Sequence, residues 1–503
     1  MAVRIPGKIV WLNSELAQQI GIPAEQILEM CSVRALRRGE SLDGREPVRL
    51  YADQYGGSDI LPCRGAGRSG FLSHGNFYLK GVGHTPLYKK HRDDDFQHTH
   101  GGLSLFECML EALFGEVSAH FLTHGSARIL AILDQGDFTI HPDGTRVARA
   151  IAVRAGSQLR PGHVFAYTVQ GQAARLEQFL RIVRATGQLV RRDLTATMLR
   201  IVDDHALTAA ELYRWRMFHG AISMSNMEMS GAMLDTTTQS IQPRTAPLKV
   251  LTDHRDETNI VYGREHLQRA HELAIVYRAI INGLTAAERR AINATKIDFA
   301  AAMQQSYERH LHLQMLTAIG LRADVARRID ADYPKVARRA TKVLLRMASL
   351  RNPGNVNANE VTGERISVLD VFNLLRVYPS HPDRRVIDCL QPIYGGDAPR
   401  RKKMRLQVRA LIEDFERAYA DLMSACHRVA PESYGTIAEM QRSIALRASA
   451  ENRPLDALYR SNVVRDFTEA VDAYVQSRNP AVISGMLSER IAASRRKCDF
   501  GVR

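Results

Sequence analysis

Short apolar runs separated by glycine clusters occupy the first third of the chain. Runs rich in Val, Ile, Phe and Tyr at 77–79, 127–133 and 164–167 predict β-strands. Apolar residues recur every fourth position across 103–121, which predicts a helix between the first two strands. Strands, a glycine loop and one helix therefore make residues 1–165 a mixed α/β region.

The remainder of the chain has mainly helical spacing. Amphipathic helices are predicted around 179–185, 273–280 and 411–422, where apolar residues lie three and four positions apart. Asn, Pro and Gly dominate 352–359, which predicts a loop. The fold class that follows is α+β, with the strands gathered in the N-terminal region.

These patterns divide the chain into three parts. We expect a mixed α/β part at 1–165, a helical part at 166–350 and a helical C-terminal extension at 351–503. The sequence contains neither an internal repeat nor a long low-complexity segment.

Composition favours a globular protein without a membrane span. Of the 503 residues 45% are hydrophobic, but no run of 18 apolar residues occurs. Charges and Asn interrupt the apolar residues of 1–20, which is not typical of a signal peptide. The six cysteines form no C-x-x-C pair and are typical of reduced thiols. We therefore expect a cytoplasmic protein.

The net charge of +14 raises the question of an anionic partner. Nucleic-acid binding would need a basic face with aromatic platforms or a known motif, and the sequence shows neither. The basic run at 400–403 follows a Gly- and Pro-containing stretch and is typical of a solvated linker and helix start. An arginine-rich composition accounts for the charge, so we expect no nucleic-acid partner.

Two clusters carry residues suited to nucleotide chemistry. Lys80 ends an apolar strand and is followed by Gly-Val-Gly. Asn226 and Asp235 lie nine positions apart in a cluster that begins at His219. A lysine can contact phosphates, and an amide with a carboxylate supplies oxygen ligands of the kind that magnesium prefers. Together these side chains indicate a kinase-like nucleotide site.

Both clusters resemble motifs of the selenoprotein O family of protein adenylyltransferases. Residues 79–86, Leu-Lys-Gly-Val-Gly-His-Thr-Pro, are similar to the family's Leu-Lys-Gly-Ala-Gly-x-Thr-Pro. Residues 219–228 are similar to its His-Gly-Val-Met-Asn-Thr-Asp-Asn-Met-Ser, and Asp235 follows at the family's spacing. The segment 7–17 also looks like the start of a family member. The resemblance covers about 8–285 in ordered blocks.

The resemblance implies a two-lobed protein-kinase-like fold with a mixed α/β small lobe and a mostly helical large lobe. It implies transfer of AMP from ATP to a hydroxyl side chain of a protein or peptide, with Mg²⁺ or Mn²⁺ as the metal. The partners that follow are ATP and a protein or peptide acceptor, and no membrane.

The resemblance also implies roles for the charged residues around the first cluster. Lys80 would contact phosphate and Glu111 would hold it in place, with Glu107 one helical turn earlier as the alternative partner. Asn226 and Asp235 would bind the metal. Taken alone, each of these residues would be interpreted as an ordinary surface charge, a turn residue or a helix cap, and the matched blocks around them favour the functional roles.

Two further segments look like phosphate-binding elements of the family. Gly65, Gly67 and Arg68 lie in a Gly-Ala-Gly-Arg-Ser-Gly loop similar to the family's Gly-Asp-Gly-Arg-Ala. Arg154 and Arg160 lie where the family has two arginines that reach the nucleotide phosphates, Arg160 directly and Arg154 after a one-residue gap. Glycine lets backbone N–H groups approach a phosphate, and a guanidinium donates two parallel hydrogen bonds to it.

Ser225 is the largest departure from the family. Family members have Asp immediately before the metal-binding Asn, where it would accept the proton of the acceptor hydroxyl. Serine cannot act as a general base near pH 7, and Glu228 is a nearby carboxylate that could replace it. The alternatives are therefore a kinase-like phosphotransferase or peptide-tailoring enzyme on the same scaffold, and an ATP-binding pseudoenzyme that acts as a scaffold.

Histidine pairs offer a weaker metal reading. His98 with His100, and His310 with His312, have the alternate spacing that can bind zinc, but no third ligand accompanies either pair. We interpret them as structural or solvated histidines. The methionines of the second cluster are interpreted as core packing: Met224, Met227, Met229 and Met233.

Overall fold

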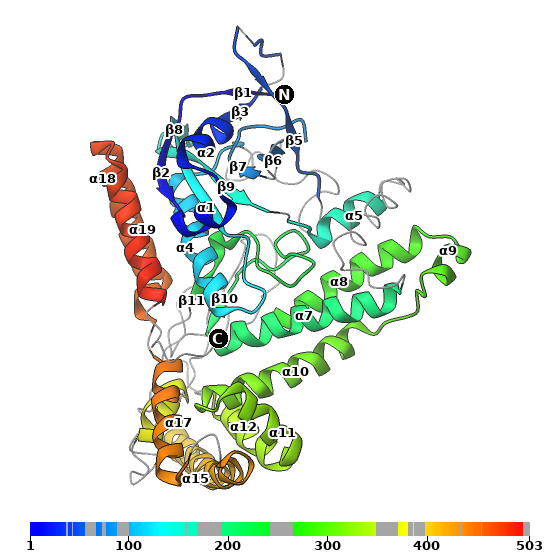
Figure 1. The fold of residues 1–503 in the computed structure, drawn as a ribbon, viewed down its shortest axis with the longest axis vertical. Helices are drawn as coiled ribbons and strands as arrows, with labels where there is room; N and C mark the ends of the chain where they lie inside the picture. Colours follow the sequence, from blue (N-terminus) through cyan, green and yellow to red (C-terminus); the bar gives the residue numbers. More distant parts are fainter. Residues whose placement is uncertain are drawn as a thin grey trace.

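Antiparallel sheets occupy the N-terminal part of the chain and helices most of the remainder (Figure 1). The computed structural model describes residues 1–36, 39–42, 44–55, 67–72, 77–87, 100–156, 158–169, 193–241, 265–348, 371–380, 386, 398–431, 435–453 and 455–495. The predicted α+β class is confirmed for this part of the chain.

The largest sheet has six antiparallel strands, and its order places β7 between β9 and β6. In spatial order the strands are β2 (Lys8–Leu12), β8 (Ile129–Ile140), β9 (Arg146–Ala155), β7 (Phe77–Lys80), β6 (Ser69–Leu72) and β5 (Leu50–Ala52). Smaller sheets are formed by β3 (Val33–Ala35), β1 (Ala2–Arg4) and β4 (Pro47–Val48), and by β10 (Met217–Phe218) and β11 (Ser240–Ile241).

The strand register places the candidate phosphate residues on one face of this sheet. Lys80 is paired with Ala152, and Tyr78 with Arg154. Because side chains alternate between faces along a strand, Tyr78, Lys80 and Arg154 point to the same side. The intervening Leu79 is buried in an apolar cluster on the other side, so a shift of one residue in register would bury the charges there.

Helix α4 (Leu105–Phe121) packs against β8 and β9. Ser104 begins it with a capping box, in which its hydroxyl accepts the Glu107 N–H and the Glu107 carboxylate accepts the Ser104 N–H. The helix is buried over most of its circumference, which explains why polar groups such as Glu111 need partners there.

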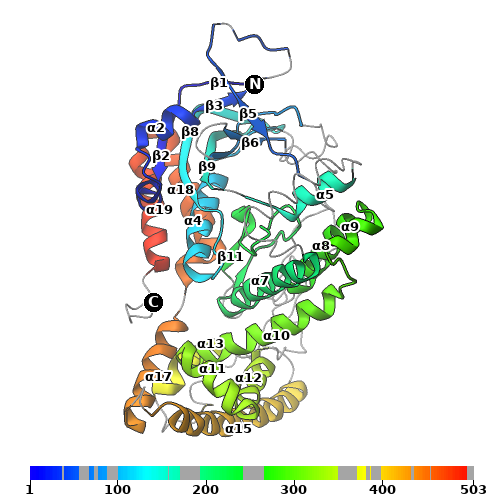
Figure 2. The same cartoon turned by 45° about the vertical axis from the view of Figure 1, so that its right-hand side comes forward.

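Apart from α1 and α2 near the N-terminus, the other helices of the described part all begin at residue 161 or later (Figures 1 and 2). They are α1 (Ser14–Ile20), α2 (Ala24–Cys31), α5 (Pro161–Val169), α7 (Leu194–Arg214), η1 (Thr236–Thr238), α8 (Glu265–Asn282), α9 (Ala286–Ala291), α10 (Phe299–Ala318), α11 (Ala323–Asp332), α12 (Pro334–Ala348), α13 (Val371–Val377), η2 (Tyr378–Ser380), α15 (Ala398–Val429), α17 (Ile437–Glu451), η3 (Asp456–Leu458), α18 (Arg460–Ser477) and α19 (Pro480–Arg495), with α1 and α2 beside the sheet.

Two of the apolar cores meet near the second sequence cluster. One joins α7, α8, α10, α12 and α15 and includes Met224, Met227 and Met229. The other joins α4, the large sheet, α18 and α19 and includes Met233. All four methionines are at most 2% exposed, which confirms that they are packing residues.

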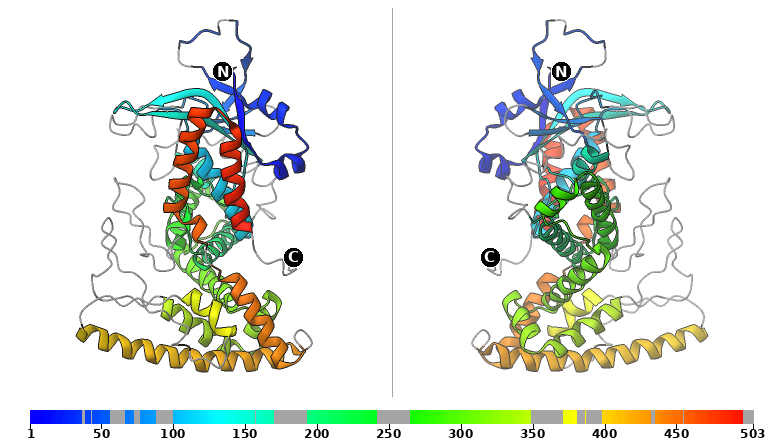
Figure 3. Two further views of the ribbon diagram at one scale, coloured as in Figure 1. Left: turned by 90° about the vertical axis from the view of Figure 1, so that its left-hand side faces the viewer. Right: turned by 90° about the vertical axis from the view of Figure 1, so that its right-hand side faces the viewer.

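The C-terminal helices of the described part pack against the large sheet near the N-terminal strand β2. Figure 3 shows α18 and α19 side by side along the sheet and α4, whereas α15 lies at the opposite end of the molecule. Helix α19 contacts both α4 and β2, so residues from the two ends of the sequence share one core.

Most of the predicted elements that fall on described residues are confirmed, but one is wrong. Strands β7 and β8 and helix α4 match the expectations for 77–79, 127–133 and 103–121. Residues 164–167, predicted as a strand, lie in α5, which begins at Pro161. Proline suits the first turn of a helix, and packing of α5 on α8 overrides the β propensity of Val, Phe and Tyr.

Other predictions find partial support. Helices α8 and α15 contain the predicted segments 273–280 and 411–422. The segments 179–185 and 352–359 lie outside the described residues. The division at residue 165 passes through α5, and the three-part division of the chain stays a prediction.

Two chemical expectations concern thiols and membranes. In the described part, Cys31, Cys108 and Cys426 are buried free thiols, and burial raises the pKa of Cys31 and of Cys426 to about 12. Within that part no helix has the length and apolar character needed to cross a bilayer.

Candidate functional site

Strand β7 delivers Lys80 to the centre of the candidate site. The next residue, Gly81, has φ of +100°, and a Cβ there would lie 2.6 Å from the carbonyl oxygen of Ala150. Only glycine tolerates that conformation and approach. The N–H groups of Gly81 and Val82 donate to the Arg68 carbonyl, at 2.9 and 3.2 Å, so the glycine fixes the chain against the neighbouring loop.

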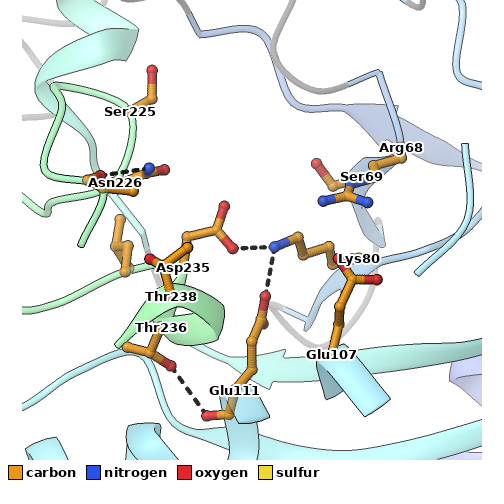
Figure 4. A network of polar contacts seen from close by, with 12 residues as sticks. Arg68, Ser69, Lys80, Glu107, Glu111, Ser225, Asn226, Asp235, Thr236 and Thr238 are labelled. Carbon is orange, nitrogen blue, oxygen red and sulfur yellow. Dashed lines mark hydrogen bonds and ion pairs between the residues drawn. The ribbon is translucent and has the colours of Figure 1, made fainter. Parts of the chain in front are cut away.

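Lys80 lies between two carboxylates (Figure 4). Its Nζ is 2.5 Å from Glu111 Oε1 and also forms an ion pair with Asp235. Lys80 and Glu111 are 5% and 1% exposed in their side chains, whereas Asp235 is 21% exposed. The pair with Glu111 that the sequence predicts is therefore present, and Asp235 forms the more accessible side of the triad.

Glu107, the alternative partner, has a different task. Its carboxylate caps α4 by accepting from Ser104, at 2.9 Å from the N–H and 2.8 Å from the hydroxyl. Burial opposes its ionisation, but the charge of Arg68 and the Ser104 N–H lower the pKa of Glu107. Glu111, not Glu107, is the residue that binds Lys80.

Arg154 is held by the other oxygen of the same carboxylate. Its Nη2 pairs with Glu111 Oε2, and its Nη1 donates to Gln158 Oε1 at 3.1 Å. The guanidinium carbon is 5.6 Å from the centre of the Tyr78 ring. Its Nη2 is 4.0 Å from Asp235 Oδ1, so Arg154 adds a second positive charge beside that carboxylate.

These cations keep Asp235 ionised. Burial opposes ionisation, but the positive charges of Lys80 and Arg154 outweigh it and hold the pKa of Asp235 well below its usual range. Its backbone has φ of +55° and ψ of +56°, a left-handed conformation that costs free energy in a residue other than glycine. The surrounding contacts therefore impose this geometry.

Arg160 also lies next to Tyr78, and its Nη2 donates to the Tyr78 hydroxyl at 3.3 Å. Its Nη1 donates to the Ser225 carbonyl, and its guanidinium carbon is 4.4 Å from the centre of the Tyr55 ring. Its Nε is 4.0 Å from Asp53 Oδ2, and His163 contacts the other Asp53 oxygen at 2.7 Å. Asp53 balances the charge of Arg160, so each of the two candidate phosphate arginines has a carboxylate beside it.

The glycine loop is described only in part. Gly65 lies outside the described residues, whereas Gly67 and Arg68 are buried next to Lys80. The Gly67 carbonyl accepts from the Thr85 N–H at 2.8 Å, and Arg68 Nη1 donates to the Gly102 carbonyl at 3.0 Å. Figure 4 shows the Arg68 side chain directed toward Lys80.

Asn226 and Asp235 lie at the same end of a tight turn, whose two sides are joined by a β-bridge between Met227 and Met233. The Leu234 N–H donates to the Asn226 carbonyl at 3.3 Å. The Asn226 side-chain Nδ2 donates to the Ala221 carbonyl at 2.8 Å. This bond directs the Asn226 Oδ1 away from the Ala221 carbonyl, and Figure 4 shows the Asp235 side chain between Asn226 and Lys80.

Ser225 is completely buried, and its hydroxyl points away from Asp235 in Figure 4. Its contribution to the site is a hydrogen bond, in which the Ser225 backbone carbonyl accepts from the Arg160 guanidinium. Glu228 accepts from the Ser230 hydroxyl at 2.6 Å, and burial raises the pKa of Glu228. A serine hydroxyl cannot accept a proton near pH 7, whereas a carboxylate can, and a raised pKa makes that carboxylate a stronger base. Of Ser225 and Glu228, Glu228 is therefore the candidate base.

Helix α8 holds this loop from below with two buried glutamates. Glu265 accepts the His219 N–H at 3.0 Å and Glu272 accepts the Met224 N–H at 3.2 Å. His219 in turn donates from Nε2 to the Leu234 carbonyl at 2.7 Å, next to Asp235. Burial lowers the pKa of His219 to about 4 and raises that of Glu265 to about 7.

Several of these supporting residues are missing from the sequence-based predictions. Tyr78 could have been found, because it lies two positions before Lys80 on a strand and must share its face. Asp53, His163 and Glu265 carry no such signal, since their partners lie far away in the sequence.

The residues present fit a nucleotide with its metal. Some buried nitrogen atoms have no hydrogen-bond partner among the described residues: Nε of Arg68, Arg154 and Arg160, and Nε2 of Gln158. Oxygens of a polyphosphate are the acceptors that such donors need. Asn226 and Asp235 supply one amide and one carboxylate oxygen, the hard ligands that magnesium shares with phosphates.

The histidine pairs show no such arrangement. His310 contacts Asp203 at 2.9 Å, whereas His312 contacts Asp330 at 2.9 Å and Thr341 at 2.8 Å. His98 lies outside the described residues, and burial lowers the pKa of His100 to about 4. Across the described ranges, no group of three or more His, Cys, Asp or Glu side chains is placed to hold a metal ion.

Comparison with known proteins gives relatives at low identity. No protein-family profile matches the chain. Over 274 residues it is 26% identical to a protein named protein nucleotidyltransferase YdiU from Alkaliphilus metalliredigens (strain QYMF), covering 51% of this chain and 53% of that protein. It is also 26% identical over 242 residues to proteins of the same name from Mycobacterium sp. (strains KMS and MCS), covering 45% of this chain and 48% of theirs.

The chain thus spans about half the length of the curated relatives that it matches. These matches support the resemblance seen in the two sequence clusters, because YdiU proteins belong to the selenoprotein O family. The chain is thus similar to the YdiU proteins, at 26% identity over about half of its length.

Proposed function

We propose that the chain is a nucleotidyltransferase that moves AMP from ATP to a hydroxyl side chain of a protein or peptide. One observation carries the proposal: Lys80 lies between Glu111 and Asp235, with Arg154 on the second oxygen of Glu111. The relatives named protein nucleotidyltransferase support the reaction class. The order along the chain is also that of a two-lobed kinase-like fold: strand β7 with Lys80, then helix α4 with Glu111, then the turn with Asn226 and Asp235.

Each residue then has a role in binding. Lys80 and Arg154, fixed by Glu111, neutralise the phosphates from the sheet side, and Arg160 does so from the side of Tyr78. Asn226 and Asp235 hold Mg²⁺ or Mn²⁺, which neutralises charge on the phosphates when bound. Gly67 and Arg68 border the phosphates next to Lys80.

The acceptor oxygen forms a bond to the α-phosphorus while the bond from that phosphorus to the bridging oxygen breaks, and pyrophosphate leaves. Catalysis consists mainly of positioning and charge stabilisation, because phosphoryl-type transition states ask little of a base. The hydroxyl proton is released to Glu228 or to water. With Ser225 in place of the family's Asp, we expect a slow enzyme.

A second candidate function is an ATP-binding scaffold without transfer activity. The observation that favours it is Ser225, whose buried hydroxyl points away from the metal residues. A phosphotransferase acting at the γ-phosphorus would use the same residues, so the test must separate all three.

The test is incubation of the purified chain and a protein mixture with ATP labelled at either the α- or the γ-phosphate. Label on protein from the α position only, lost in Asp235→Ala, is the expected result. Label from the γ position only would establish phosphotransfer instead. Binding of ATP with no transfer of either label would make the chain a scaffold.

A further inference from the structure

The loop that follows Asp235 is held between α4 and the C-terminal helices. On the α4 side, the Thr236 hydroxyl donates to the Glu111 carbonyl at 3.3 Å. The Gln239 side chain and the Ser118 hydroxyl of α4 are hydrogen-bonded, at 2.9 and 3.1 Å. Residues 236–239 therefore lie against the same helix that supplies Glu111 to Lys80.

Arg460, the first residue of α18, holds the opposite side of this loop. Its Nη1 is 3.0 Å from the Thr237 carbonyl and 3.0 Å from the Gln239 carbonyl. A parallel β-bridge joins the preceding Tyr459 to Ile241. The Arg460 side chain thus crosses from the C-terminal helices to a loop more than 200 residues away in sequence.

The environment of Arg460 indicates that these carbonyls are its main partners. Burial lowers its pKa, and among the described residues no carboxylate offsets that effect. A guanidinium taken out of water needs acceptors, so separating the loop from Arg460 would cost free energy.

Helices α18 and α19 hold Arg460 in place, because both pack against α4 and α19 also packs against the large sheet. Phe467 of α18 packs edge-on against Phe106 of α4, with ring centres 6.5 Å apart. Tyr474 donates to Asp134 at 2.6 Å, and Arg495 of α19 is 2.5 Å from Glu116 of α4. Helices α18 and α4 are therefore packed together, and both contact the loop after Asp235.

We propose that Arg460 is a positioning residue that holds the 236–239 loop against α4, so that Asp235 keeps the strained geometry in which it faces Lys80 and the metal. The inference rests on the proposed nucleotide site and adds to it a residue from outside the motif-bearing region. Arg460 is not itself a ligand of the nucleotide or the metal, and acts through the carbonyls of Thr237 and Gln239.

The experiment compares Arg460→Met and Arg460→Lys with wild type and with a control. Met keeps the apolar stem and removes the donors, whereas Lys keeps a charge that can reach one carbonyl at a time. Arg465→Met is the matched control, because Arg465 lies on the same helix with a 64% exposed side chain that contacts Asp466. All four proteins are used as the full 503-residue chain.

Two readouts are measured on each protein. Hydrogen–deuterium exchange without ligand reports protection of the amides in 235–241. Calorimetric titration with ATP at a series of magnesium concentrations reports the magnesium midpoint of ATP binding. In Arg460→Met we expect faster exchange confined to 235–241 and a midpoint raised about tenfold, as for residues that orient a metal ligand. Arg460→Lys should be intermediate, and Arg465→Met should match wild type.

Unchanged exchange or an unchanged midpoint in Arg460→Met would overturn the positioning role while leaving the nucleotide site intact. Faster exchange throughout the chain, with Arg460→Lys equal to Arg460→Met at the site, would also overturn it, since it would show a general folding role. A wild type that binds no ATP at any magnesium concentration would reject the proposed function, and the positioning role with it.

Discussion

Glu111 and Asp235 contact the same atom, Nζ of Lys80, although one lies on the helix over the sheet and the other on the loop after β10. The two carboxylates are not equivalent. The Glu111 side chain is 1% exposed, and its two oxygens are occupied by Lys80 and Arg154. The Asp235 side chain is 21% exposed. Asp235 is therefore the carboxylate of the two that is open to a ligand, and in the proposed function it exchanges its contact with Lys80 for a metal ion.

Lys80→Ala and Glu111→Ala should be strongly non-additive in ATP affinity. Each removes the same ion pair, so the double variant should lose less than the sum of the singles, by about 1–3 kcal/mol. Calorimetry on the four members of the cycle measures this. Glu107→Ala serves as the control: it should cost about 1 kcal/mol of stability through the lost cap of α4 and leave the coupling unchanged.

Asp235→Asn should abolish the effect of magnesium on ATP binding. The amide keeps the shape of the side chain but removes the charge that attracts a cation, so affinity with magnesium should fall at least about tenfold, or about 1.4 kcal/mol. Asp137→Asn, on an exposed stretch of β8, is the matched control. An Asp235→Asn protein that binds ATP as tightly as wild type in magnesium would remove Asp235 from the metal site.

Ser225→Asp should raise the rate of AMP transfer, by up to about 10²-fold, because it restores a carboxylate next to Asn226. The new carboxylate would be buried, and we expect the melting temperature to fall at the same time. Transfer of α-label and thermal unfolding are measured on the same preparations. An active wild type whose rate does not change in the variant would show that position 225 is not where the proton is accepted.

Glu265→Gln should change the pH dependence of stability. Burial raises the pKa of Glu265 from about 4.5 to about 7. Its stabilising contribution is therefore complete below about pH 4.5 and is lost as the pH rises through 7, where the folded state must bury the charge. Gln keeps an oxygen for the His219 N–H but has no charge to bury.

Relative to wild type, Glu265→Gln should gain stability from pH 5 to pH 8, by about 3 kcal/mol, since one pKa unit is worth about 1.4 kcal/mol. Urea unfolding at a series of pH values measures the difference. Glu469→Gln, an exposed position on α18, should show no such slope. Parallel pH profiles of Glu265→Gln and wild type would disprove the buried-acid assignment.

The elements that carry Lys80 and Glu111 could be predicted from local sequence. An apolar strand followed by glycines, and a helix with apolar residues at every fourth position, are each recognisable within one short segment. The choice between Glu111 and Glu107 needed the fold, since both lie on the same helical face and only packing decides which one reaches Lys80. The strand predicted at 164–167 failed for a related reason: α5 is stabilised by α8, about 100 residues further along the chain.

Arg460 is a residue whose role could not be predicted from the sequence. It begins an ordinary amphipathic helix, and its partners are backbone carbonyls, which carry no side-chain identity that a sequence pattern could reveal. The buried partners Asp53 and His163 are hidden in the same way, because their contact is fixed by a fold that brings together residues 110 positions apart.

The ion pair between Glu15 and Arg495 joins residues separated by 480 positions. A ribosome adds about 5–20 residues per second, so β2 waits about 25–100 s for the helix that covers it. During that time the apolar residues of β2 and α4 that α19 later buries face the solvent or a chaperone. Covering of this sheet edge therefore comes late, after β2, β8 and α4 have all been made, and any reaction that depends on the C-terminal helices must follow synthesis of α19.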